Sequence, residues 1–193
     1  PQIAPAVDVG VQDGWPYAAY DMNGRSTLAD LPRKGLPGPE AATLSNGLLL
    51  GLAYAHEAGV THGDIQPGMC IVDEQGQASL AGLEVASESP AAQALAAAAI
   101  TAAGSQLSTQ RAAAERDVLA VGLLLHGLLA GVPALEEADI GRALVRLPRH
   151  GREIVRLPWS GPHPVAEPLR AIVNRATDRQ ERQRYRNART LLR

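Results

Sequence analysis

The sequence predicts an α+β fold that is predominantly helical, and three observations support this class. From Pro39 to Ala58, apolar residues recur at the spacing of one helix face, and Gly59 then supplies a left-handed helix end. Between Val118 and Leu129 nearly every residue is apolar, which is typical of a helix buried on all sides. The expected β content is small, because hairpins are indicated only near the N-terminus and at residues 70–81.

Turn and cap residues indicate the first elements. Two short apolar runs lie on either side of Gln12-Asp13-Gly14, a combination that is typical of a hairpin turn. Ser26 is the expected N-cap of a short helix that continues to about Leu31 and stops near Pro32. Beyond the helix of residues 39–58, two brief strands are expected at 70–73 and 78–81.

The second half of the chain is expected to be helical. An alanine-rich, almost uncharged segment covers residues 89–110, and its composition fits either a partial helix or a flexible stretch. Gly131 and Pro133 end the buried helix. Two or three further helices are expected, near residues 136–146, 165–177 and 187–193.

The composition fits one domain of 193 residues with an apolar content of 46%. The single cysteine, Cys70, excludes an internal disulfide and fits a reducing compartment. No apolar run reaches the roughly 18 residues that a membrane span needs, and no basic-then-apolar signal segment follows Pro1. We therefore expect a cytoplasmic protein, or the cytoplasmic part of a longer, membrane-tethered chain.

Charge is unevenly distributed along the chain. Residues 1–141 carry five Arg/Lys against sixteen Asp/Glu, whereas residues 142–193 carry thirteen Arg against four acidic residues. A basic C-terminal part fits an acidic partner or nucleic acid, but it also fits arginine-rich surface helices that pack on an acidic body. Aromatic residues, which usually accompany single-strand binding, make up only 3% of the chain, so nucleic-acid binding is not expected.

Four segments together resemble a known family. Residues 52–86, "LAYAHEAGVTHGDIQPGMCIVDEQGQASLAGLEVA", resemble the catalytic and metal-binding segment of a bacterial Ser/Thr protein kinase. In that family H-R-D-x-K-P-x-N precedes a β-hairpin and D-F-G. Residues 116–135 resemble its buried central helix, residues 168–192 its closing helices, and residues 5–31 its last small-lobe strands, hinge and first large-lobe helix.

The resemblance implies a domain organisation. Residues 1–24 would form the last small-lobe strands and the hinge. Residues 25–193 would form a protein-kinase-like large (C-terminal) lobe as a single domain. The fold is thus expected to be this lobe with a remnant of the small-lobe strands.

The catalytic-loop positions depart from the family pattern. His62 and Asp64 remain, but Gly63 replaces the Arg, Gln66 the phosphate-facing Lys, and Met69 the metal-binding Asn. Phosphoryl transfer depends on Mg²⁺ that neutralises the phosphates, and Mg²⁺ prefers oxygen ligands.

The metal-binding motif departs as well. Gly82, Leu83 and Glu84 stand where D-F-G belongs, so the aspartate that would hold Mg²⁺ is lost. One alternative is that Glu84 reaches back to a cation. We expect no bound metal and no cofactor.

Other matching residues are expected to be structural. His62 would brace the loop, and Asp64 would either hold backbone amides or act as a base. Asp117 resembles the buried aspartate that anchors this loop, and Arg184 resembles the partner of a glutamate that is Gln110 here. Candidates for phosphorylation or partner binding are Thr101, Ser105, Ser108 and Thr109, in the activation-segment equivalent.

The departures predict a pseudokinase, a signalling scaffold that is not an enzyme and that acts through protein–protein contacts. By the resemblance, its partner would be another kinase, a phosphothreonine-reading domain or cell-envelope machinery. The alternative is an atypical nucleotide-dependent phosphotransferase that a missing small lobe or a partner chain completes.

Overall fold

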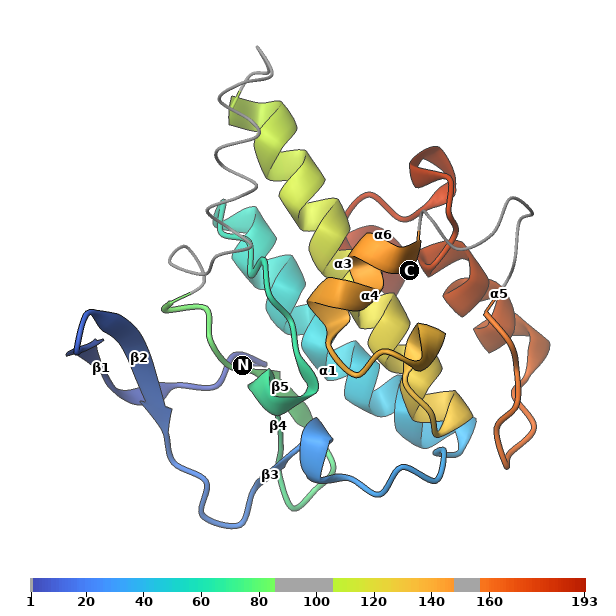
Figure 1. The fold of residues 1–193 in the computed structure, drawn as a ribbon, viewed down its shortest axis with the longest axis horizontal. Coiled ribbons are helices and arrows are strands. Elements are labelled where there is room, and N and C mark those ends of the chain that lie inside the picture. The colour runs from blue at the N-terminus through green and yellow to red at the C-terminus, as the bar shows by residue number, and fades with distance from the viewer. Residues whose placement is uncertain (1, 86–105, 148–156) are drawn as a thin grey trace.

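The computed structural model describes residues 2–85, 106–147 and 157–193 (Figure 1). The helices gather into one body, and two small sheets lie along one side of it. This mixed content agrees with the predicted α+β class. The helices are α1 (Gly38–Glu57), α3 (Gln106–Ala130), α4 (Ile140–Arg146), α5 (Glu167–Ala176) and α6 (Ala188–Leu192), with short 3₁₀ turns η1 (Leu28–Asp30), η2 (Pro67–Met69), η4 (Ala134–Glu136) and η6 (Glu181–Gln183).

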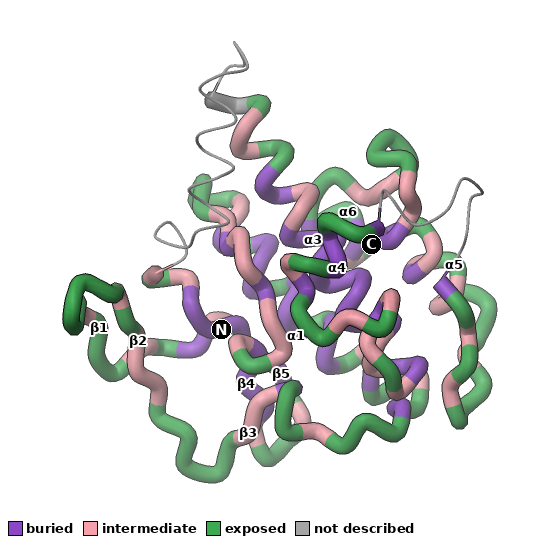
Figure 2. The backbone as a smooth tube through the Cα atoms, viewed as in Figure 1, coloured by how far each residue is buried: buried purple, intermediate pink, exposed green. Residues whose placement is uncertain are grey.

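The core forms where α1 and α3 pack together with the helices that follow them. Leu48 and Leu52 of α1 and Leu123 of α3 are fully buried, and Figure 2 shows the buried backbone concentrated along these two helices. Burying one such side chain stabilises the fold by about 1.5–3 kcal/mol. The nearly continuous apolar run of α3 is therefore explained by its burial, as the sequence predicts.

A three-stranded antiparallel sheet in the order β3-β4-β5 lies against α1. Gly47 and Gly51 of α1 allow this close approach. A Cβ added at Gly47 would lie 2.4 Å from the Ala78 carbonyl oxygen, and one at Gly51 would lie 2.5 Å from the Gln2 carbonyl oxygen. The strands are β3 (Ser26–Thr27), β4 (Cys70–Val72) and β5 (Ala78–Leu80).

The N-terminal hairpin extends away from the helical body (Figure 1). Strand β1 (Ala6–Gln12) pairs antiparallel with β2 (Trp15–Tyr20), and the turn places Asp13 and Gly14 at positive φ. Val9 and Val11 of β1 are 55% and 71% exposed, so one face of the hairpin is uncovered in the part of the chain that the structure describes.

Two predicted elements differ from the structure. Ser26 is not an N-cap, because it lies in β3 and pairs with Val72 of β4. The N-cap of the turn η1 is Thr27, whose backbone amide donates to the Asp30 carboxylate. The tertiary contact with β4 thus overrides the local cap signal. The buried helix is also longer than the run 118–129, because α3 already begins at Gln106.

The remaining elements lie close to their predicted places. Strands were expected at 70–73 and 78–81, and the last helices begin at Ile140, Glu167 and Ala188. Most of the alanine-rich segment lies outside the described residues. In the described ranges, no helix combines the length and apolarity that crossing a membrane would require.

Candidate functional site

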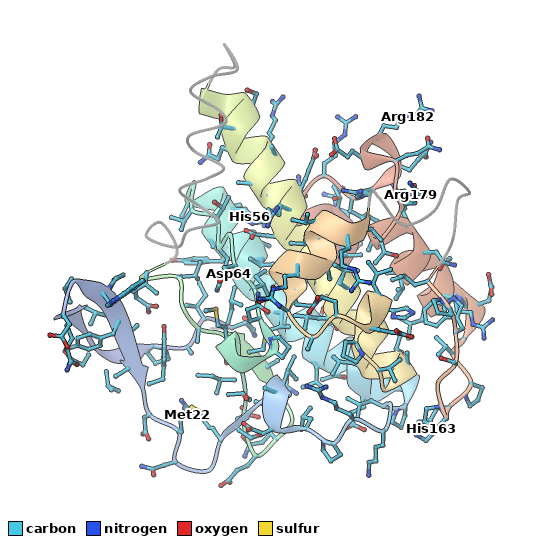
Figure 3. The ribbon with its side chains drawn as sticks, viewed as in Figure 1. Met22, His56, Asp64, His163, Arg179 and Arg182 are labelled. Atoms are coloured by element: carbon cyan, nitrogen blue, oxygen red, sulfur yellow. The ribbon has the colours of Figure 1, made fainter. Side chains whose placement is uncertain are left out.

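The candidate site is the loop of residues 60–69, which connects α1 to β4, together with residues 81–85 after β5. The two segments lie close together because β4 and β5 form a hairpin that returns the chain to the loop. The Ala81 amide donates to the Met69 carbonyl at 2.8 Å, which joins the two segments directly. Figure 3 shows Asp64 on this loop beside the helical body.

Asp117 of α3 holds the loop through hydrogen bonds. Its carboxylate is 1% exposed and accepts hydrogen bonds from the backbone amides of His62 and Gly63, both at 2.8 Å. His56 of α1 approaches the same carboxylate with Nε2 at 3.0 Å. A buried carboxylate requires such donors, because desolvation without partners is costly. One side chain thus joins α1, α3 and the loop.

His62 connects the loop to the segment after β5. Its ring is buried, with Nε2 at 2.8 Å from the Ala81 carbonyl oxygen. The Asp64 amide donates to Nδ1 at 3.3 Å, so Nδ1 is the acceptor and Nε2 carries the proton. In this tautomer His62 is a neutral brace between the two halves of the site.

Gln66 binds groups within the protein rather than projecting freely. Its Nε2 donates to Asp64 Oδ1 at 2.8 Å, and its Oε1 accepts from the Ile140 amide at 3.0 Å. Gln66 therefore orients Asp64 and attaches it to the start of α4. An amide can make both bonds at once because it is donor and acceptor, whereas a lysine could only donate.

The residues present do not fit a Mg²⁺ site. Gly82 has no side chain to offer a metal, and its φ is +93°. A Cβ added there would lie 3.3 Å from His62 Nε2 and 3.4 Å from the thioether sulfur Sδ of Met69. A hard cation binds thioether sulfur poorly and needs oxygen ligands. Among the described residues, no group of three or more His, Cys, Asp or Glu could hold a metal ion.

Glu84 is bound by a residue of the N-terminal hairpin. Tyr20 Oη donates to Glu84 Oε2 at 2.5 Å and accepts from the Gly82 amide at 2.7 Å. Burial, followed by the hydrogen bond to Glu84, raises the pKa of Tyr20 to about 12. Leu83, between these two residues, packs against the core. The Gly82–Glu84 segment is thus closed by an internal network.

Arg184 and Gln110 make separate contacts. Arg184 donates from Nε to the Asp178 carbonyl and from Nη2 to the Arg179 carbonyl. Burial lowers the pKa of Arg184, while nearby carboxylates, Glu181 first, act in the opposite direction. Gln110 donates to the Gly59 carbonyl at 2.6 Å, at the far end of α1.

The phosphorylation candidates are only partly described. Thr101 and Ser105 lie outside the described residues. Ser108 is exposed and Thr109 is half-buried, and both lie in the first turn of α3 rather than in a loop.

Two side chains take part in the site without having been assigned to it. They are His56 and Tyr20, which are not among the candidate residues named from the sequence. Each contacts the site across more than 60 residues of sequence. No local pattern signals such a contact, although an isolated tyrosine at the end of a strand is a weak indication.

In this geometry a buried aspartate holds a His-x-Asp loop, and a short hairpin precedes a Gly-Leu-Glu segment. The chain is 36% identical over 75 residues to the Ser/Thr-protein kinase TAO3 of Xenopus laevis and 37% identical over 73 residues to that of Homo sapiens. It is 29% identical over 154 residues to the Ser/Thr-protein kinase PknL of Mycobacterium tuberculosis. No family model matches the chain.

These similarities are partial. They cover 39% of this chain and 8% of Xenopus TAO3, and 72% of this chain and 37% of PknL. They support a kinase-like family and a kinase-like domain in this chain.

One prediction is corrected by these relatives. The replaced charged positions of the catalytic loop predict a protein that is not an enzyme. The relatives are named Ser/Thr protein kinases, which are enzymes. Loss of individual motif residues is therefore no ground for excluding enzymatic function, and activity in this chain must be measured.

Proposed function

We propose that this chain is the large lobe of a kinase-like domain and acts as a regulatory module that binds a protein partner. The closed hydrogen-bond network of the site is the observation that carries this proposal. Gln66 bridges Asp64 to α4, and Tyr20 bridges Gly82 to Glu84. Polar groups that would face a nucleotide in a kinase instead bind one another, which stabilises one shape of the surface.

An apolar pocket beside the loop supports a docking role. It has a volume of about 260 Å³ and lies where Pro67 and Gly68 face η1 and the end of α3. Leu31, Leu128 and Val132 contribute to its wall, and Arg33 lies at its edge. A pocket of this kind suits an apolar anchor side chain of a partner protein.

The class of partner is inferred from the resemblance to bacterial Ser/Thr kinases. We infer another kinase, a phosphothreonine-reading domain or cell-envelope machinery as the partner, in contact with residues 62–69, with residues 90–109 or with the arginine-rich C-terminal part. The buried Cys70 fits a reducing, cytoplasmic setting, and a membrane tether in a longer chain is compatible with it.

A second candidate function is nucleotide-dependent phosphotransfer. The names of the relatives favour it, as does the retained Asp64, which is half-buried at the surface of the site. Such activity would need oxygen ligands for Mg²⁺ from a small lobe or a partner chain.

Calorimetric titration with ATP, with and without Mg²⁺, separates the two functions. We expect the regulatory module to show no Mg²⁺-dependent binding, in the wild type or in Asp64→Asn. Asp13→Asn, at the exposed tip of the hairpin, is the matched control. Saturable, Mg²⁺-dependent binding that is lost in Asp64→Asn and kept in Asp13→Asn would contradict the regulatory proposal and favour the second candidate.

A further inference from the structure

A second pocket is lined by His56, the residue that contacts Asp117 from α1. It has a volume of about 740 Å³ and is formed by the end of α1, the first turns of α3 and the residues that lead into α6. This volume is within the range of about 300–1,000 Å³ that organic ligands occupy. Its lining differs from that of the apolar pocket, because it includes several charged side chains.

The charges that line this pocket do not cancel. Three arginines, Arg111, Arg186 and Arg189, stand against two glutamates, Glu57 and Glu115. Arg189 is already paired with Glu57. Neither Arg111 nor Arg186 has an ion-pair partner within the described ranges, and both are exposed to solvent in the pocket. Two guanidinium groups are thus available for an anion.

His56 adds a buried group to the same pocket. Its side chain is only 9% exposed, and Nε2 lies 3.0 Å from Asp117 Oδ2. The other ring nitrogen, Nδ1, is buried and has no hydrogen-bond partner in the described part of the chain. Buried polar atoms normally have partners, so an orphan in a pocket wall indicates a missing one. When the ring is protonated on both nitrogens, Nε2 donates to Asp117 and Nδ1 is free to donate to a ligand.

We infer that this pocket binds a phosphate monoester. A tetrahedral oxyanion offers several terminal oxygens, which matches donors that come from separate elements: Arg111 on α3, Arg186 before α6 and His56 on α1. The pocket is larger than a phosphate group alone, so the ligand carries an organic part. The site is separate from the loop surface of the proposed function and does not depend on it.

Occupancy of this pocket is coupled to the loop through one side chain. The Asp117 carboxylate that contacts His56 also accepts from the amides of His62 and Gly63. An anion that holds His56 in its protonated form keeps a positively charged imidazolium beside the Asp117 carboxylate, which redistributes these hydrogen bonds. Because coupling is reciprocal, whatever binds at the loop would also change anion affinity.

Sulfate is the probe for the oxyanion, since it stays a dianion between about pH 5 and 8 and cannot itself titrate. NMR titrations at constant ionic strength, balanced with chloride, follow the amide of Gly63 and the ring of His56. The double variant Arg111→Gln/Arg186→Gln should weaken sulfate binding at least tenfold. Arg182→Gln is the matched control, because Arg182 lies outside the pocket and contacts Gln180; Figure 3 shows it on the outer turn before α6.

The dependence on pH tests the role of His56. Sulfate should bind more tightly at pH 5.5 than at pH 7.5, and His56→Gln should remove this difference. Asp117 on α3 contacts the ring, and the other charged groups of the pocket are Glu57 on α1, Arg111 and Glu115 on α3, and Arg186 and Arg189 beside α6.

The organic part is examined with O-phosphoserine, glycerol 3-phosphate and serine. Tighter binding of O-phosphoserine identifies a phosphorylated side chain as the ligand, and equal binding of the two esters shows that the phosphate is recognised by itself. Serine should not bind. Equal sulfate affinity of the wild type and the double variant would overturn the site, and binding without any shift of the Gly63 amide would overturn the coupling.

Discussion

Single side chains hold the loop of residues 62–69 in place, and the contacts come from three directions. Asp117 binds it from α3, His62 connects it to Ala81, and Gln66 attaches it to α4. Each contact satisfies a polar group that would otherwise lose water without compensation. The shape of the site therefore depends on a few pairs of atoms rather than on the apolar core alone.

Tyr20→Phe tests the network that closes the Gly82–Glu84 segment. The variant leaves the Gly82 amide without its acceptor, and we expect the free energy of unfolding at pH 7 to fall by about 1–2 kcal/mol. Urea unfolding measures the change. Tyr17→Phe is the control, because Tyr17 Oη binds the exposed Asp8 within the hairpin, and its loss should cost less than about 0.5 kcal/mol. Equal effects of the two variants would contradict the network.

The pH dependence of Tyr20 follows from its raised pKa. A phenol whose pKa is about 12 in the folded state and 10.0 in the unfolded state contributes stability that is complete below pH 10. This contribution is lost as the pH rises from about 10 to 12, because the unfolded state releases the proton first. Tyr20→Phe should therefore lose less stability than the wild type over this interval, as monitored by urea midpoints. A parallel decline would show that Tyr20 does not titrate differently on folding.

At the scale of elements, the contact between α1 and the sheet depends on two glycines. The backbone of Ala78 in β5 approaches Gly47 so closely that no side chain fits between them. Helix propensity disfavours glycine by about 1 kcal/mol relative to alanine. The close packing of helix on strand is what offsets this cost.

Gly47→Ala and Gly127→Ala distinguish packing from propensity. Gly47→Ala should destabilise the protein by about 1–3 kcal/mol, because the new methyl group overlaps the Ala78 carbonyl. Gly127 lies in α3 with its nearest neighbour, the Val132 carbonyl oxygen, 3.5 Å from an added Cβ. Gly127→Ala should therefore be neutral or stabilise by up to about 1 kcal/mol in urea unfolding. A stabilising Gly47→Ala would show that helix and strand are not in close contact.

At the scale of the whole molecule, stability is distributed unevenly. The two long helices share the core, whereas the β1–β2 hairpin is largely exposed and is attached mainly through Tyr20. An isolated two-stranded hairpin is only marginally stable in water. The hairpin should therefore open locally without unfolding of the rest.

Hydrogen exchange monitored by mass spectrometry tests this distribution. Amides of β1 and β2 should exchange at least about 100-fold faster than the buried amides of α1 and α3, because local opening requires much less free energy than global unfolding. Segments with equally slow exchange would show that the hairpin belongs to the same cooperative unit as the core. Exchange of the turn at Asp13 and Gly14 provides the fast internal reference.

The sequence by itself determined the elements whose signal is local. Apolar periodicity placed α1 within one residue at each end, and the all-apolar run identified the buried part of α3, because burial of a helix follows directly from which of its faces are apolar. The His-x-Asp loop and the Gly-Leu-Glu segment were recognised by their resemblance to kinase motifs, and the hairpin between them by its two short apolar runs.

Only the tertiary structure decided what the polar side chains of the site do. Tyr20 and Glu84 are 64 residues apart, Gln66 and Ile140 are 74 apart, and His56 and Asp117 are 61 apart. Ser26 has a good local cap signal and still forms a strand with Val72. A hydrogen bond joins atoms about 3 Å apart in space, whatever the distance between their residues in the sequence. Its partners are therefore set by how the helices and strands pack.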